Sequence, residues 1–217
     1  MTPPVVFDLD GTLIDSLPNI TDAANALLEG QGLDPLTPAQ VGRFVGFGER
    51  VFLERLIAAT ALPADDFDAL MPVFLSHYKA VAQDTRLFDG ARAALDALAG
   101  QGVRLGLCTN KPSGPLAPVL ETTGLNDVFD VVVAGDTLPK RKPDPAPVQH
   151  AFERLGAPGL YVGDSEVDAE TAERANLPFA LFTRGIRYSP IAAIPHWMAF
   201  DDFSEFSDIY EAFLRRA

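Results

Sequence analysis

The sequence predicts an α/β protein in which a parallel sheet carries helices on both faces. The first observation is a set of short apolar runs of strand length along the chain, at residues 5–7, 103–108, 128–134, 160–162 and 179–183. The second is that helical patterns alternate with these runs from about residue 87 onward, which is typical of right-handed crossovers between parallel strands. The third is size, since 217 residues with 47% hydrophobic content can bury a substantial core.

The first apolar run stops on two acidic residues. Residues 5–7 are followed by Asp8, Leu9, Asp10 and Gly11. In open α/β sheets ligands bind beyond the carboxyl ends of the strands, so both carboxylates are expected at the rim of a site. Two carboxylates on the same face repel each other unless a cation or a proton separates them, which favours metal-assisted chemistry. For this motif alone, the alternative is a strand-end turn in which Asp caps backbone N–H groups.

The strand pattern disappears between residues 16 and 82, where helical spacing replaces it. Apolar stripes run from Ile20 to Leu28, from Val51 to Ile57 and from Phe67 to Val81, the last interrupted by Pro72, and Thr37 to Gln40 read as a capping box. We therefore expect a helical cap domain over residues 16–82, inserted into a core domain of residues 1–15 and 83–217. The flanking stretches 13–18 and 83–90 are candidate hinges. A helical layer packed permanently on the sheet is the alternative.

Three later apolar runs also end on residues suited to phosphate or metal binding. The runs lead into Thr109-Asn110-Lys111, into Lys140-Arg141-Lys142-Pro143 and into Gly163-Asp164-Ser165-Glu166-Val167-Asp168. Because the carboxyl ends of parallel strands meet at one edge, we expect an Asp pair, a hydroxyl, a lysine and a second acidic pair to come together there. Chance produces this ordered set much less often than any one of its members.

The C-terminal third is expected to supply the last strand, at residues 179–183, and a helix that packs on the sheet. The helix is indicated by apolar residues at helical spacing: Phe203, Phe206, Ile209, Tyr210 and Phe213. The three histidines are scattered without ligand spacing and are interpreted as ordinary surface or core residues.

Charge and composition limit the partners. Thirty acidic against 17 basic residues give a formal charge of −13, which argues against a nucleic-acid or anionic-membrane partner. No apolar run approaches the roughly 20 residues of a membrane span, and no signal stretch precedes the first strand, so a cytoplasmic location is expected. The single Cys108 excludes an intramolecular disulfide and is interpreted as a buried core residue rather than a reactive thiol.

With these motifs the chain resembles the haloacid dehalogenase superfamily of phosphohydrolases and, within it, the phosphoglycolate phosphatase group. The motifs are Asp8-Leu9-Asp10-Gly11-Thr12, Thr109-Asn110, Lys142-Pro143 and the stretch 163–168, and the resemblance covers essentially all 217 residues. Gly46-Phe47-Gly48 in the inserted segment favours the narrower group. The resemblance implies a Rossmann-like core with an inserted helical cap, and a small phosphorylated metabolite as substrate.

The resemblance also implies roles for the acidic residues. Asp8 would attack phosphorus to form an aspartyl-phosphate, which water then hydrolyses. Asp10 would protonate the leaving oxygen and later deprotonate the water. In this family Mg²⁺ is held by the carboxylates at the positions of Asp8 and Asp164 and by the backbone carbonyl at that of Asp10. Such oxygen ligands are those that Mg²⁺ prefers.

The remaining motifs would contact the phosphoryl group. Thr109 would hydrogen-bond it, helped by the backbone N–H of Asn110, and Lys142 would neutralise its charge. Lys140 competes for that role, but Lys142 directly precedes the proline of the family pattern and is preferred. Asp168 is expected to anchor Lys142 or a metal-bound water, and its alternative is a plain acid at a helix N-terminus.

The substrate that the resemblance favours is 2-phosphoglycolate, whose carboxylate must meet hydrogen-bond donors. The best source in the predicted cap is the turn at Gly46 and Gly48, together with Arg43 and Arg50. For each arginine the alternative is a solvent-exposed helix residue.

Other functions compete with this interpretation. A phosphatase or phosphomutase for another small phosphorylated metabolite, such as a sugar phosphate, would share the core chemistry and differ in its cap. A phospho-accepting receiver domain would leave the cap without a purpose, and a dehalogenase would not need Asp10. A catalytically silent binding protein conflicts with the intact motifs. Both a monomer and a homodimer are compatible with the sequence.

Overall fold

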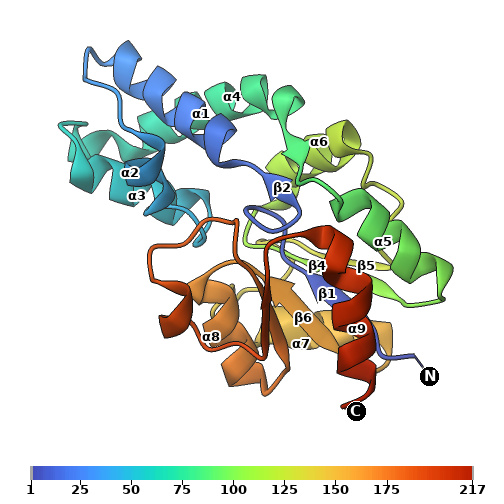
Figure 1. Cartoon of the computed structure of the whole chain (residues 1–217). Helices are drawn as coiled ribbons and strands as arrows, with labels where there is room; N and C mark the ends of the chain where they lie inside the picture. The colour runs from blue at the N-terminus through green and yellow to red at the C-terminus, as the bar shows by residue number, and fades with distance from the viewer. Residues whose placement is uncertain (1, 217) are drawn as a thin grey trace.

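The protein is described by a computed structural model that covers residues 2–216. At its centre six strands form one parallel sheet in the order β5-β4-β1-β6-β7-β8 (Figure 1). Their bounds are Val5–Phe7 for β1, Leu105–Cys108 for β4, Val131–Val133 for β5, Leu160–Gly163 for β6, Phe179–Phe182 for β7 and Met198–Phe200 for β8. The predicted α/β class with a parallel sheet is confirmed.

Helices cover both faces of the sheet, as predicted. They are α5 (Ala91–Gly100), α6 (Ser113–Thr123), α7 (Ala146–Leu155), α8 (Glu166–Ala175) and α9 (Phe206–Leu214). Val5 and Phe7 of β1 pack in the apolar cluster that includes α5, α6 and α9, whereas Val6 packs in the cluster that includes α7 and α8. Because successive side chains of a strand point to opposite faces, the central strand is buried on both sides.

The strand β8 was not predicted. The expectation that residues 179–183 form the last strand is wrong, because Met198–Phe200 pair in parallel with β7. The new strand has three residues, of which one, Phe200, is buried, and this is too short for an alternating pattern to reveal. The aromatic stripe that follows is buried as predicted, and its first residues form a short 3-10 helix at Phe203–Glu205 ahead of α9. Another 3-10 turn covers Ile191–Ala193.

The predicted helical insertion consists of four α-helices. They are α1 (Leu17–Gly30), α2 (Pro38–Gly42), α3 (Glu49–Ala59) and α4 (Phe67–Val81), with short 3-10 turns at Ala64–Asp66 and Ala82–Asp84. The helix α2 begins with the predicted capping box, in which the Thr37 side chain accepts a hydrogen bond from the Gln40 backbone N–H. Pro72 lies inside α4 and does not divide it.

The insertion packs as a unit above the sheet (Figure 1). Apolar side chains of α1 to α4 form a cluster of their own, separate from the two clusters of the sheet. The two predicted hinges pair with each other as the antiparallel strands β2 (Ile14–Asp15) and β3 (Arg86–Leu87), so the chain leaves and re-enters the sheet-bearing part at one place. Both features support the proposal that residues 16–82 are a cap and that residues 1–15 and 83–217 are a core. These two names are used below.

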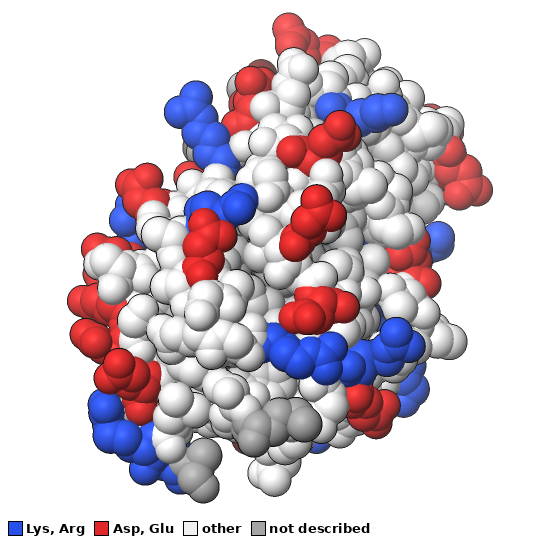
Figure 2. Space-filling model, turned by 90° about the vertical axis from the view of Figure 1, so that its right-hand side faces the viewer, with Lys and Arg blue, Asp and Glu red and all other residues white. Residues whose placement is uncertain are grey.

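Charged side chains of both signs lie on the surface of the protein. Acidic side chains are spread over the face shown in Figure 2, with basic ones interspersed. Within residues 2–216, no helix combines the length and the apolar character that crossing a membrane requires.

Because β1 lies between β4 and β6, the residues that follow these three strands, Asp8, Thr109 and Asp164, meet at one edge of the sheet beneath the cap.

Candidate active site

A cavity lies between the cap and the carboxyl edge of the sheet. Six predicted core residues line it: Asp8, Asp10, Thr109, Asn110, Lys142 and Asp164. From the cap, Gly46 and Gly48 line it as predicted, and apolar side chains of the cap form much of its remaining wall. Residues that follow β1, β4, β5 and β6 and residues of the insertion, distant in the sequence, therefore line one cavity.

Asp8 directly follows β1 and is held in an apolar setting. Its side chain is 9% exposed, and its Oδ1 lies 2.7 Å from Nζ of Lys142. Burial raises the pKa of Asp8 to about 7, and the charge of Lys142 opposes this shift. A poorly hydrated carboxylate beside one ammonium group is well placed to act as a nucleophile.

Lys142, and not Lys140, lies at the centre of the cavity's polar end. Its side chain is 3% exposed, and Nζ lies 2.7 Å from Asp8, 2.8 Å from Asp168 and 3.1 Å from the hydroxyl of Tyr161. Burial would lower the pKa of Lys142, but the charges of Asp168 and Asp8 raise it above its ordinary value, so the ammonium group stays charged. Lys140 is 67% exposed and forms a surface ion pair. This geometry supports the preference for Lys142, whose role stays a prediction.

Asp168 contacts Lys142 and is also an acid at the N-terminus of a helix, two arrangements that the sequence left as alternatives. Its Oδ1 accepts hydrogen bonds from Lys142 at 2.8 Å and from the hydroxyl of Tyr161 at 2.6 Å. Its Oδ2 accepts from the hydroxyl of Ser165 at 2.6 Å and, as the third residue of α8, closes a capping box at the start of that helix. Burial would raise the pKa of Asp168, but Lys142 and these hydrogen bonds hold it below its usual range.

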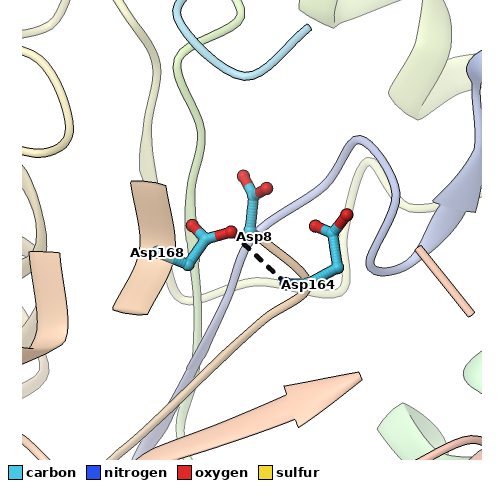
Figure 3. Close-up of side chains that lie close together, drawn as sticks. All are labelled: Asp8, Asp164 and Asp168. Atoms are coloured by element: carbon cyan, nitrogen blue, oxygen red, sulfur yellow. Dashed lines mark hydrogen bonds between the residues drawn. The ribbon is translucent and has the colours of Figure 1, made fainter. Parts of the chain in front are cut away.

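Three carboxylates lie close enough to share a cation. Asp8, Asp164 and Asp168 each offer an oxygen, and these oxygens lie within 4.8 Å of one another. Figure 3 shows the three side chains side by side, with a hydrogen bond from the backbone N–H of Asp164 to Asp168. Since Asp168 is occupied by Lys142 and its other partners, Asp8 and Asp164 are the carboxylates left for a metal ion.

The donor set suits a hard divalent cation. Burial, together with the charges of Asp168 and Asp8, raises the pKa of Asp164 well above its usual range. A divalent cation between two buried carboxylates would stabilise both in their charged form. Thr12 donates to Oδ1 of Asp164 at 2.8 Å, which fixes the orientation of the carboxylate. Gly11, at φ +83°, passes so close to Asp164 that a Cβ at this position would overlap the carboxylate.

The side chains of Thr109 and Asn110, the two residues after β4, differ in their hydrogen bonds. Oγ1 of Thr109 accepts a hydrogen bond from the backbone N–H of Lys111 at 3.1 Å, which leaves its hydroxyl hydrogen for a ligand. The side chain of Asn110 is engaged within the protein. It donates to the carbonyls of Gly46 at 2.8 Å and Lys142 at 2.9 Å, and it accepts from the Lys142 backbone N–H at 3.0 Å. Asn110 therefore holds a cap turn and the lysine segment together.

Arg43 and Arg50 do not line the cavity. The side chain of Arg50 is 68% exposed, its Nε lies 3.1 Å from Glu54, and its guanidinium group stacks on the ring of Phe67. Arg43, at the end of α2, is exposed as well. Both arginines therefore match the alternative of a solvent-exposed helix residue in this structure, and their predicted role in substrate binding gains no support from the geometry.

The cavity also contains a lysine to which the sequence pattern assigned no role. Nζ of Lys111 lies 2.9 Å from Oδ2 of Asp10 and donates to the hydroxyl of Tyr78 at 2.6 Å. The other oxygen of Asp10, Oδ1, is buried and has no hydrogen-bond partner within residues 2–216. Asp10 is therefore held through Oδ2 alone. The position of Lys111, directly after the Thr109-Asn110 motif, was the available signal.

Two cap residues complete this corner of the cavity. The hydroxyl of Tyr78, on α4, contacts Lys111 as described, and burial raises the pKa of Tyr78 to about 12. Glu49, the first residue of α3, has a buried carboxylate oxygen without a hydrogen-bond partner in the described part of the chain. Burial raises the pKa of Glu49, and Lys111 opposes this shift. No local pattern in the sequence pointed to either residue.

Comparisons with known proteins agree with this architecture. The family model for haloacid dehalogenase-like hydrolases matches residues 5–182. A phosphoglycolate phosphatase of Cereibacter sphaeroides is 44% identical over 216 residues, which cover 98% of this chain and 99% of the relative. One of Rhodospirillum rubrum is also 44% identical, over 94% and 89% of the two chains. The crystal structure of a predicted phosphoglycolate phosphatase from Haemophilus somnus superposes with a TM-score of 0.90 at 31% identity, covering 95% of this chain and 97% of that one.

Proposed function

The chain belongs to the haloacid dehalogenase-like hydrolase family, and we propose that it is a Mg²⁺-dependent phosphatase that hydrolyses 2-phosphoglycolate to glycolate and phosphate. The observation that carries this proposal is the contact of 2.7 Å between Asp8 and Lys142 in the cavity between the cap and the sheet. The substrate comes from the relatives, because proteins named phosphoglycolate phosphatase match this chain over nearly its whole length.

In the first half of the proposed reaction, a carboxylate oxygen of Asp8 attacks phosphorus. The bond between phosphorus and the ester oxygen breaks, and an aspartyl-phosphate forms. Lys142 neutralises the charge of the phosphoryl group and of Asp8, and the hydroxyl of Thr109 hydrogen-bonds a phosphoryl oxygen. Because both groups are already in place and poorly hydrated, they stabilise the transition state without reorganising.

Asp10 handles the proton in both halves of the reaction. It donates a proton to the leaving ester oxygen, so that glycolate departs as an alcohol and not as an alkoxide. It then accepts a proton from the water that attacks the aspartyl-phosphate, which releases phosphate and restores Asp8. Asp10 lines the cavity, and its Oδ1 has no hydrogen-bond partner within residues 2–216.

Mg²⁺ would be held by the carboxylates of Asp8 and Asp164 and by the backbone carbonyl of Asp10. When bound, it supplies positive charge between the nucleophile and the phosphate dianion, which would otherwise repel each other. The formal charge of −13 makes this local compensation necessary for an anionic substrate.

The test is a screen of the purified protein against a panel of small phosphate esters with Mg²⁺, scored by release of inorganic phosphate. We expect 2-phosphoglycolate to give the highest kcat/KM in the panel. A sugar phosphate as the best substrate would assign a different phosphatase activity. Conversion of an ester to its isomer without stoichiometric phosphate release would identify a phosphomutase.

The metal requirement has a separate test. Chelation should stop phosphate release and Mg²⁺ should restore it, whereas Ca²⁺ should bind without supporting turnover, because its longer and more numerous bonds misplace the nucleophile. Equal rates with Ca²⁺, or hydrolysis after chelation, would contradict the proposed metal site. The cytoplasmic location and the choice between monomer and homodimer stay predictions.

A further inference from the structure

Lys111 is the second buried lysine of the cavity, and its surroundings differ from those of Lys142. Its side chain is 5% exposed, and Nζ contacts Asp10 at 2.9 Å and the hydroxyl of Tyr78 at 2.6 Å. A lysine ammonium group has three N–H donors. Nζ of Lys142 lies within 3.1 Å of oxygens of three residues, Asp8, Asp168 and Tyr161, whereas Nζ of Lys111 has two such neighbours, Asp10 and Tyr78, within residues 2–216. Lys111 therefore has a donor to spare.

The spare donor lies where the cavity is otherwise poor in positive charge. Arg43 and Arg50 do not line the cavity, and apolar side chains of the cap, such as Val45, Phe52 and Phe74, form the wall on that side. An anionic group of a ligand placed there would lose its hydration and would need a charged donor in exchange. In a setting of low dielectric constant, such a charge-assisted hydrogen bond is strong.

The distance from the reacting atoms also fits. Lys111 is paired with Asp10, and under the proposed function Asp10 contacts the ester oxygen of the substrate. In 2-phosphoglycolate a single methylene carbon separates that oxygen from the carboxylate. A group bound so close to the ester oxygen is within reach of the ammonium group next to Asp10.

We propose that Lys111 binds the substrate carboxylate and thereby selects phosphate monoesters that carry an anionic group one carbon away from the ester oxygen. The inference rests on the proposed function and names the residue that sets its specificity. Tyr78, on α4 of the cap, orients the ammonium group, so selection depends on the cap lying over the core. Glu49 also lies near Lys111: burial raises the pKa of Glu49, and the charge of Lys111 opposes this shift.

The experiment compares two esters that differ in the carboxylate alone. kcat/KM is measured for 2-phosphoglycolate and for ethyl phosphate in the wild type, in Lys111→Met and in the matched control Lys140→Met, whose lysine is exposed. Removal of Lys111 also disturbs Asp10, but the leaving oxygen of both esters is an alkyl oxygen that takes its proton from Asp10, so this effect cancels in the ratio of the two values. The ratio should fall about ten- to a hundredfold in Lys111→Met and stay unchanged in Lys140→Met.

The outcomes separate the two proposals. A wild type that does not prefer 2-phosphoglycolate over ethyl phosphate overturns the proposed substrate and this inference with it. A wild type with the preference and a Lys111→Met variant that keeps the ratio within threefold overturns the role of Lys111 alone. If the Met variant does not fold, Lys111→Gln, which keeps a polar side chain next to Tyr78 and Asp10, should show the same fall in the ratio, and an unchanged ratio there has the same meaning.

Discussion

The side chain of Asn110 connects the cap to the segment of Lys142, because it donates to the carbonyl of Gly46 at 2.8 Å while it exchanges two hydrogen bonds with the backbone of Lys142. A residue expected to help bind phosphate through its backbone thus also joins two distant parts of the chain. The position of the cap turn and the position of Lys142 therefore depend on one amide group.

Asn110→Ala should weaken both connections. Loss of the amide leaves buried backbone groups of Lys142 without partners, at a cost of about 1–3 kcal/mol for such a group, and we expect kcat/KM to fall at least about tenfold. Denaturant unfolding and steady-state kinetics measure the two effects. Asn25→Ala is the matched control, because Asn25 exchanges two hydrogen bonds with the backbone of Leu36 within the cap. The control should lose stability and keep its KM. Equal kinetic losses in both variants would show that Asn110 acts through stability alone.

Asp8→Asn should abolish hydrolysis while the fold persists, because an amide has nearly the same shape but is a poor nucleophile and a weaker metal ligand. The expected loss in kcat is at least about 10³-fold. Asp15→Asn changes an exposed carboxylate of the hinge strand β2 and should leave kcat unchanged. Turnover of the Asp8 variant within tenfold of the wild type would remove Asp8 as the nucleophile.

Lys142→Met should be far more damaging than Lys140→Met. Loss of the buried ammonium group leaves Asp8 and Asp168 facing each other without compensation, and breaking such a buried ion pair costs about 3–5 kcal/mol. The exposed pair of Lys140 contributes about 0–1 kcal/mol. Thermal unfolding and phosphate release should rank the two variants in this order, and the reverse order would move the charge-neutralising role to Lys140.

Gly48→Ala should disturb the site more than Gly32→Ala does. Both glycines have a positive φ, +84° and +69°, so an L residue strains the backbone at either position. At Gly48 the ψ of 168° lies in a region that is essentially confined to glycine, where a side chain costs about 1–3 kcal/mol. At Gly32 the space is open, whereas a Cβ at Gly48 would lie 2.9 Å from Arg141 Nη1 and 3.2 Å from the carbonyl oxygen of Asn110. We expect Gly48→Ala to lose more stability than Gly32→Ala, and a drop of about tenfold in kcat/KM for Gly48→Ala alone. Identical kcat/KM values for the two variants would contradict this prediction and would mean that the site tolerates a displacement of the turn at Gly48.

The thiol of Cys108 should be inert in the native protein. It is fully buried, and burial raises its pKa to about 12, so at neutral pH the reactive thiolate is scarcer by about 10³ than in a free cysteine. Because the chain has a single cysteine, labelling by a thiol reagent reports on this site alone. Labelling should be very slow without denaturant and rapid after unfolding in guanidinium chloride. Complete labelling of the native protein within minutes would contradict the interpretation of Cys108 as a core residue.

Five strands of the sheet, β1 and β4 to β7, and the order of the polar motifs were predictable because both are local properties of the chain, whereas β8 was missed. A largely apolar run of strand length such as residues 103–108 is typical of a buried strand, and the carboxyl ends of parallel strands meet at the same edge of the sheet. The meeting of Asp8, Thr109 and Asp164 therefore follows from the strand pattern alone. The helical insertion was equally visible, since its apolar spacing belongs to each helix separately.

The tertiary structure decided which side chains of the cap reach the cavity. Arg43 and Arg50 belong to a segment rich in donors, but whether a helical residue faces the core depends on how the helix is rotated against its neighbours, and here both arginines face outward. Lys111 and Tyr78 lie 33 residues apart in the sequence and meet at 2.6 Å. Their contact exists because the cap packs over the sheet, and no periodicity within either segment records how two separately formed clusters come to lie against each other.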